Sequence, residues 1–73
     1  MRRFYMYNIY IKNYNAGNGV IETEHLGVES WLIDNDTGFL ILIYNQYKTE
    51  FVALEQVLGI EVLEIRTGVM YNV

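Results

Sequence analysis

The chain contains no cysteine and no proline, and His25 is its only histidine. Without cysteine it cannot build a disulfide framework or a thiolate zinc site, and the missing thiols are typical of a reducing, cytoplasmic compartment. A transition-metal site or a catalytic triad within one chain would lack parts. The sequence therefore predicts a cytoplasmic, non-enzymatic protein with no cofactor, no metal and no catalytic residue.

Basic residues are also scarce, because five lysines and arginines face nine acidic residues and the formal net charge is −4. Proteins that bind nucleic-acid phosphates normally present a basic face, so a nucleic-acid partner is not expected. The acidity either serves solubility alone or forms a face that attracts a basic protein. The sharper version of the second interpretation is a small inhibitor, of the kind made by phages or other mobile elements, that occupies a basic groove on a target enzyme.

Long apolar runs are absent too. No segment approaches the roughly 18 residues that a spanning helix requires. Asn8 interrupts the apolar stretch after Arg2 and Arg3, and no small-residue cleavage site follows before Lys12. We therefore predict no membrane insertion. The length of 73 residues allows only one domain, over residues 1–73.

Apolar and aromatic residues are abundant and make up 52% of the chain. A domain of this size buries only about 60% of the surface of its unfolded chain, so a monomer would leave apolar surface exposed. We therefore predict a homodimer or higher oligomer, with its seam on the outer face of the first strand and at the C-terminal end.

A period of two in residues 5–12 is typical of a strand with one buried face. Residues 15–19 predict a turn, Gly27 predicts a bulge, and residues 34–38 predict a tight hairpin turn. The predicted strands cover residues 5–12, 20–33, 39–44, 51–54, 60–65 and, after a turn at Thr67-Gly68, 69–73. The predicted core consists of Tyr7, Ile9, Ile11, Ile33, Ile41, Ile43, Val52, Leu54, Val57, Ile60 and Val62.

Residues 49–59 fit two structures. A helix can begin at Thr49 as N-cap and end at Gly59. The alternative is a strand over residues 51–54 followed by one tight 3-10 turn at residues 55–57. We favour the strand and turn, because β-branched and aromatic residues open the segment and an isolated helix of about nine residues is marginal.

Several short motifs follow one another between residues 19 and 66: Leu26-Gly27-Val28, Ile33-Asp34, Thr37-Gly38, Val52-Ala53-Leu54, Val57 and Ile60-Glu61-Val62. Their order resembles the PRC-barrel family, although Ala53 stands where the family usually has proline. The resemblance implies an all-β fold, a small antiparallel SH3-like barrel of five or six strands with one short 3-10 turn or helix near residues 50–58. It also implies a role in protein contact, as in reaction-centre subunits, ribosome maturation factors and division proteins, and it transfers no catalytic residue.

Three motifs that suggest chemistry have simpler explanations. Asp36-Thr37-Gly38 matches the aspartic-protease triplet, but its flanks favour a hairpin turn. Asp34 and Asp36 also suggest a calcium loop, yet glycine comes one position early and Asn45 stands where such a loop ends in glutamate. Glu22, Glu24 and His25 could hold a metal only if they shared a face, and His25 is expected to point away from Glu24.

We predict a protein-binding module that self-associates. The expected partner-binding residues are Glu22, Glu24, Glu29, Asp34, Asp36, Tyr10 and Tyr14. The alternatives are the acidic inhibitor and a nucleotide-binding barrel that stacks a base on Tyr10, Tyr14 and Trp31.

Overall fold

The computed structural model describes the backbone of residues 2–70 and the side chains of residues 6–65. Within these limits the chain forms six β-strands and one 3-10 helix. In chain order they are β1 (Arg2–Asn15), β2 (Gly19–Val28), β3 (Ser30–Asp34), β4 (Phe39–Asn45), β5 (Lys48–Ala53), η1 (Leu54–Gln56) and β6 (Val57–Met70). The prediction of an all-β antiparallel fold is confirmed, but the single strand predicted over residues 20–33 is divided at Glu29 into β2 and β3, which belong to different sheets.

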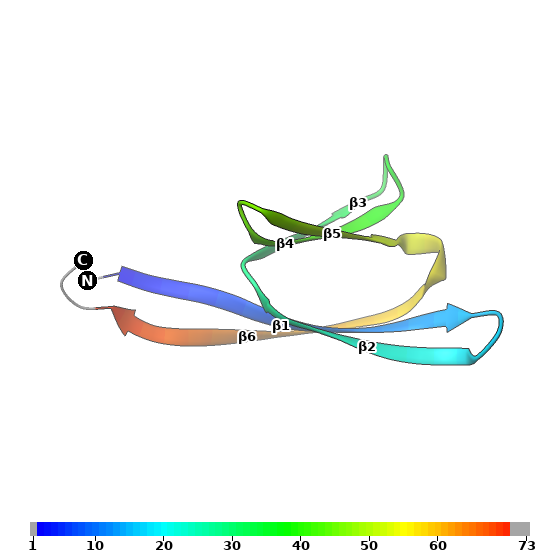
Figure 1. Cartoon of the computed structure of the whole chain (residues 1–73), viewed down its shortest axis with the longest axis horizontal. Coiled ribbons are helices and arrows are strands. Elements are labelled where there is room, and N and C mark those ends of the chain that lie inside the picture. The colour runs from blue at the N-terminus through cyan, green and yellow to red at the C-terminus, as the bar shows by residue number, and fades with distance from the viewer. Residues whose placement is uncertain (1, 71–73) are drawn as a thin grey trace.

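The strands form two antiparallel sheets of three strands each. The first sheet has the order β2–β1–β6 and the second sheet has the order β3–β4–β5. Figure 1 shows the long strands of the first sheet running along the molecule, with the short second sheet packed over part of their length. In the described part of the chain the two sheets have separate hydrogen-bond ladders, so the fold is a two-layer sandwich and not one closed ladder.

A bulge in β2 sets which of its residues face the core. Tyr7 pairs with Val28 and Ile9 pairs with His25, so β2 has one residue more than β1 in this interval. The extra residue reverses the alternation of β2 and turns Val28 inward. Gly27 has a φ of 71° within the bulge, and its N–H donates a hydrogen bond to Asn8 Oδ1 at 3.1 Å. The predicted bulge at Gly27 is confirmed.

The core lies between the two sheets. Its fully buried side chains are Ile9, Ile11, Val28, Leu40 and Leu42. The half-buried apolar side chains packed against them are Tyr7, Tyr44, Val52, Leu54, Val57, Ile60 and Val62. Eight of the predicted core residues are therefore confirmed.

The core prediction is wrong for Ile33, Ile41 and Ile43. The inward positions of β4 are Leu40 and Leu42, so Ile41 and Ile43 lie on the opposite face of the second sheet. Because β4 is apolar on both faces, no polar residue marks its inward side. Ile33 is paired with Leu40 and shares its inward side, but β3 is an edge strand and Ile33 stays 42% exposed.

The segment between β5 and β6 is a strand followed by a tight turn, as the sequence favoured. β5 ends at Ala53 and the 3-10 helix covers Leu54–Gln56, one residue earlier than predicted. β6 then begins at Val57 and not at residue 60. Among residues 2–70 no helix has the length and apolar character needed to cross a membrane.

The predicted turn at Thr67-Gly68 is wrong, because β6 continues through it to Met70. Arg3 pairs with Val69 and Tyr5 pairs with Arg66, so Thr67-Gly68 lies opposite a single residue of β1. The glycine signal therefore marks a bulge within a long strand. Residues 71–73 of the predicted last strand lie outside the described residues.

Candidate functional site

The face of the first sheet that points away from the second sheet has a tyrosine between two carboxylates. We call it the acidic face. Tyr10 of β1 is paired directly with Glu24 of β2 on one side and with Glu61 of β6 on the other. Directly opposed residues of antiparallel strands have Cβ atoms about 5 Å apart, so both carboxylates flank the half-buried ring of Tyr10.

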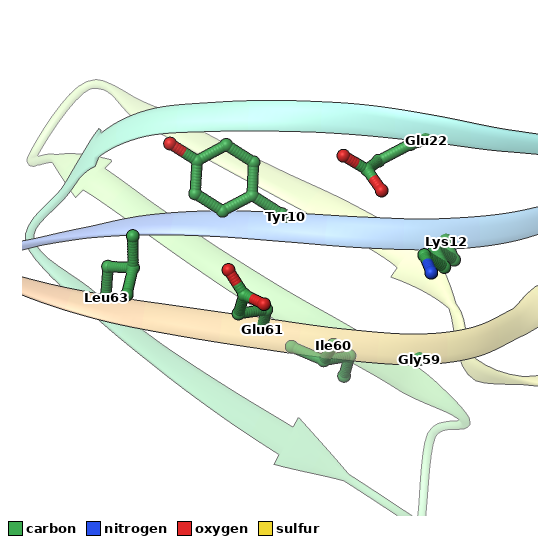
Figure 2. Close-up of a pocket in the computed structure, with 7 residues that line it drawn as sticks. All are labelled: Tyr10, Lys12, Glu22, Gly59, Ile60, Glu61 and Leu63. Carbon is green, nitrogen blue, oxygen red and sulfur yellow. The ribbon is translucent and has the colours of Figure 1, made fainter.

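A hollow opens on the acidic face next to this row. Lys12 is paired with Glu22 and with Gly59, and a Cβ built on Gly59 would meet no atom within 4 Å. The hollow has a volume of about 490 Å³. It is lined by Tyr10, Lys12, Glu22, Gly59, Ile60, Glu61 and Leu63. Figure 2 shows Tyr10, Glu22 and Glu61 on three neighbouring strands of the first sheet, with the second sheet behind them.

The charge around the hollow is negative. Three carboxylates, those of Glu22, Glu24 and Glu61, are exposed on the acidic face, whereas Lys12 contributes one ammonium group. Among the side chains of residues 6–65, none of these carboxylates has a cation within 4 Å. The carboxylates are therefore free to attract a cation, and the tyrosine ring offers it a flat apolar surface.

Four of the seven predicted partner-binding residues share the acidic face. Tyr10, Glu22 and Glu24 surround the hollow or adjoin it, and Tyr14 lies four positions beyond Tyr10 along β1, paired with Val20. Trp31 belongs to the second sheet and is paired with the buried Leu42, so it does not join Tyr10 and Tyr14 in one stacking surface.

The other predicted residues, Glu29, Asp34 and Asp36, lie elsewhere. Glu29 is at the bend between β2 and β3, where its N–H donates to the carbonyl of Ile43 at 2.9 Å. Asp34 holds the hairpin turn, because its Oδ1 accepts hydrogen bonds from the N–H groups of Asp36 at 3.0 Å and Thr37 at 3.4 Å. The side chain and backbone of Thr37 and the backbone of Asp36 lower the pKa of Asp34 below its ordinary value. Asp36-Thr37-Gly38 is therefore a turn, as the sequence favoured.

Glu61 and Leu63 are site residues that the sequence did not indicate. They alternate with Ile60 and Val62, so their outward orientation follows once β6 is recognised as a strand. Their position beside Tyr10 depends on the pairing of β1 with β6, which joins residues about 50 positions apart. No local signal in the sequence specifies that pairing.

A second polar cluster lies between the two sheets. The hydroxyl of Thr23 is 3.0 Å from His25 Nε2, and His25 Nδ1 is 3.2 Å from the hydroxyl of Tyr44 and 3.4 Å from Glu50 Oε1. His25 is thus on the inward side of β2, opposite to Glu24, as expected. Among the described side chains no three potential metal ligands converge, so His25 does not join Glu22 and Glu24 in a metal site.

The hydroxyl, imidazole and carboxylate of this cluster tie β2 to the second sheet. In the neutral tautomer of His25 that carries its proton on Nδ1, the Thr23 hydroxyl donates to Nε2 and the Nδ1–H can donate to Glu50. When His25 is protonated, Nε2–H donates to Thr23, whose own hydroxyl has the Ile11 carbonyl 3.5 Å away. The histidine therefore has partners in both states.

The same cluster shifts the titration of its acidic groups. The hydroxyl of Tyr44, and next the ring of His25, lower the pKa of Glu50 below its ordinary value, although partial burial opposes them. Burial and the neighbouring Glu50 carboxylate raise the pKa of Tyr44 well above its ordinary value. The ammonium group of Lys48 lies 4.4 Å from the centre of the Tyr44 ring. None of these groups lines the hollow on the acidic face.

The chain matches no protein-family model, no curated protein and no solved structure. The resemblance to PRC-barrels therefore stays a prediction. The acidic face and the hollow beside Tyr10 carry the functional argument.

Proposed function

We propose that this protein is a non-enzymatic protein-binding module whose acidic face binds a basic segment of a partner protein. The observation that carries the proposal is the position of Tyr10 between Glu24 and Glu61, beside an open hollow. The all-β antiparallel fold of the described residues is compatible with a small binding domain, and the adaptor role is the one that the PRC-barrel resemblance implies.

In this mechanism a lysine or arginine side chain of the partner enters the hollow. Its charged end lies over the ring of Tyr10 and pairs with the flanking carboxylates, while its alkyl chain packs against Leu63. The net charge of −4 steers the basic partner toward the protein before contact. An exposed cation–π contact contributes about 0.5–1 kcal/mol and each of the two exposed ion pairs about 0.2–1 kcal/mol, so the site contributes roughly fivefold to 150-fold in affinity.

The acidic inhibitor uses the same face in the same way and differs only in its partner, an enzyme whose basic groove the face occupies. Stoichiometric addition of this protein would abolish the activity of such an enzyme and leave an adaptor's partner active. A nucleotide is a weaker candidate, because the carboxylates around Tyr10 would repel its phosphates.

The proposal is tested with a fluorescent peptide of about ten residues that contains lysine and arginine, titrated by anisotropy at low and high salt. The double variant Glu24→Lys/Glu61→Lys should weaken binding by about tenfold or more. Its matched control is Glu29→Lys/Glu55→Lys, which changes the net charge equally at two exposed residues away from the hollow. Equal losses in both double variants would show that binding follows net charge alone and would refute the site.

Gly59→Leu tests the hollow without changing any charge. The added side chain meets no atom at its Cβ position, so it should fill the hollow and leave the fold intact. We expect Gly59→Leu to weaken peptide binding at every salt concentration. The electrostatic part of the binding affinity should instead decrease as the salt concentration rises, because the screening length falls to about 8 Å at physiological ionic strength. Full affinity in Gly59→Leu would show that no side chain enters the hollow.

A further inference from the structure

The second sheet has apolar side chains on the face that points away from the core. We call it the apolar face. Leu32, Ile41 and Phe51 lie directly opposite one another across β3, β4 and β5. Ile43 and Phe39 lie on either side of this row, and the rings of Phe39 and Phe51 meet edge to face with centres 5.9 Å apart. Phe51 is 62% exposed and Leu32 is 56% exposed, so the described part of the chain does not cover this face.

The apolar face has almost no charge. Its border includes Ser30 and Thr49, which are paired with Ile43, and Ala53, which is paired with Phe39. Asp34 is the one charged residue in these rows, and the backbone N–H groups of its own turn bind its carboxylate. A solvent-facing patch of this composition is typical of a surface that is buried against another protein.

We propose that a second copy of this chain covers the apolar face, so that two protomers stack their second sheets in a homodimer. The charges favour this occupant, because an acidic chain can meet itself there with only one carboxylate on each copy, that of Asp34 at the border of the face. On the acidic face, by contrast, two copies would bring Glu22, Glu24 and Glu61 against the same residues of the partner. A basic partner is drawn to the acidic face, which the homodimer leaves free.

The inference deepens the proposed function, since it rests on a protein-binding role and adds self-association on a separate surface. It also moves the expected seam from the outer face of β1 to the second sheet. A twofold axis through the apolar face would place Phe51 and Leu32 of one protomer against the same patch of its partner. Sheets stacked in this way lie about 10 Å apart, which leaves room for interdigitated side chains.

The size of the face sets the strength of the dimer. Three strands about 4.8 Å apart and five residues at about 3.4 Å each give a flat footprint of roughly 240 Å². A stable interface buries about 800 Å² on each partner, so this dimer belongs to the weak, concentration-dependent class. We expect a dissociation constant of about 10–100 µM.

Sedimentation equilibrium of the unaltered chain from about 1 µM to about 1 mM covers this range on both sides. The weight-average mass should rise from 8.6 kDa toward twice that value. In a dilution series of ¹H–¹⁵N spectra, the amide signals that move with concentration should belong to β3, β4 and β5. A constant mass of 8.6 kDa, or shifts confined to β1, β2 and β6, would overturn the proposal.

The variants Phe51→Lys and Leu32→Lys should each raise the dissociation constant at least tenfold, because each buries an unpaired ammonium in the seam. Both side chains are more than half exposed, so the folded monomer should tolerate the changes. Leu63→Lys and Tyr10→Glu are the matched controls on the acidic face and should dimerise like the wild type. Loss of the dimer in the controls alone would place the seam on the acidic face and refute the inference.

The two proposals fail separately. Phe51→Lys should still bind the basic peptide, and Glu24→Lys/Glu61→Lys should still dimerise. A dimer that forms without any peptide binding refutes only the acidic-face function. Peptide binding by a strict monomer refutes only the second copy as occupant of the apolar face.

Discussion

Leu42 and Leu32 lie on opposite sides of the second sheet, so the same leucine-to-alanine substitution at each position compares a buried site with an exposed one. Leu42 is fully buried between the sheets, whereas Leu32 is 56% exposed on the apolar face. Leu42→Ala should destabilise the protein by about 3 kcal/mol or more, because it loses the transfer free energy of the side chain and leaves a cavity. Leu32→Ala gives up less than half of that transfer term and leaves no cavity, so its cost should be about 1 kcal/mol or less.

These losses are large on the scale of the whole domain. At about 0.05–0.15 kcal/mol per residue, a chain of 73 residues has a stability of about 4–11 kcal/mol. Leu42→Ala should therefore lower Tm by about 12–24 °C, and Leu32→Ala by less than about 8 °C. Urea unfolding followed by circular dichroism measures the two losses in free energy of unfolding, and thermal unfolding measures the two Tm values. Both experiments are done at about 1 µM, where the proposed dimer dissociates. A larger loss for Leu32→Ala would mean that the inward and outward sides of the second sheet are assigned the wrong way round, and equal losses would refute the difference in burial.

Gly38→Val should destabilise the fold by about 1–3 kcal/mol more than Gly17→Val. Gly38 has a φ of 79°, which a β-branched residue rarely adopts. A Cβ on Gly17, by contrast, makes only an ordinary contact of 3.5 Å with Asn15 Oδ1. Chemical denaturation of the two variants checks this difference, and equal stabilities would contradict it. The lowered pKa of Glu50 adds stability at pH values above the ordinary range of a glutamate, and that stability should disappear as the pH falls through the folded-state pKa. Glu50→Gln should abolish this part of the acid limb in a series of melting curves, and an unchanged acid limb would exclude the contribution. The raised pKa of Tyr44 adds stability at the alkaline end of the pH range. This stability is complete below pH about 10 and should be lost as the pH rises above it, and Tyr44→Phe should flatten that loss in the same melting curves.

Local signals in the sequence are enough for several of the strands and turns of this fold. The glycines at positions 27 and 38 mark a bulge and a hairpin turn, and both have positive φ in the structure. The alternation over residues 5–12 correctly orients Ile9 and Ile11 toward the core. These features depend on backbone sterics and on a period of two, which a single sequence displays directly.

The errors arise where both faces of a strand are apolar or where pairing is long-range. In β4 the alternation is apolar on both sides, so the sequence cannot distinguish Leu42 from Ile41 as the inward residue. Thr67-Gly68 has turn composition, but its structure is decided by pairing with β1, which is distant in sequence. The sequence indicates Glu22 and Glu24 as neighbours on one face, because they are two positions apart in one strand. It does not indicate Glu61, which joins them only through the pairing of β6 with β1.

The separation of the two sheets also predicts an order of folding. The second sheet is a continuous meander over residues 30–53 with short connections, so its ladder can form from local contacts alone. The first sheet can form its β1–β2 hairpin early, but its remaining ladder needs β6, whose partners in β1 are more than 40 residues away. Closing that long loop is the entropically costly step, and contacts of high sequence separation slow folding. The pairing of β6 with β1 should therefore come late in folding, after the meander and the β1–β2 hairpin have formed.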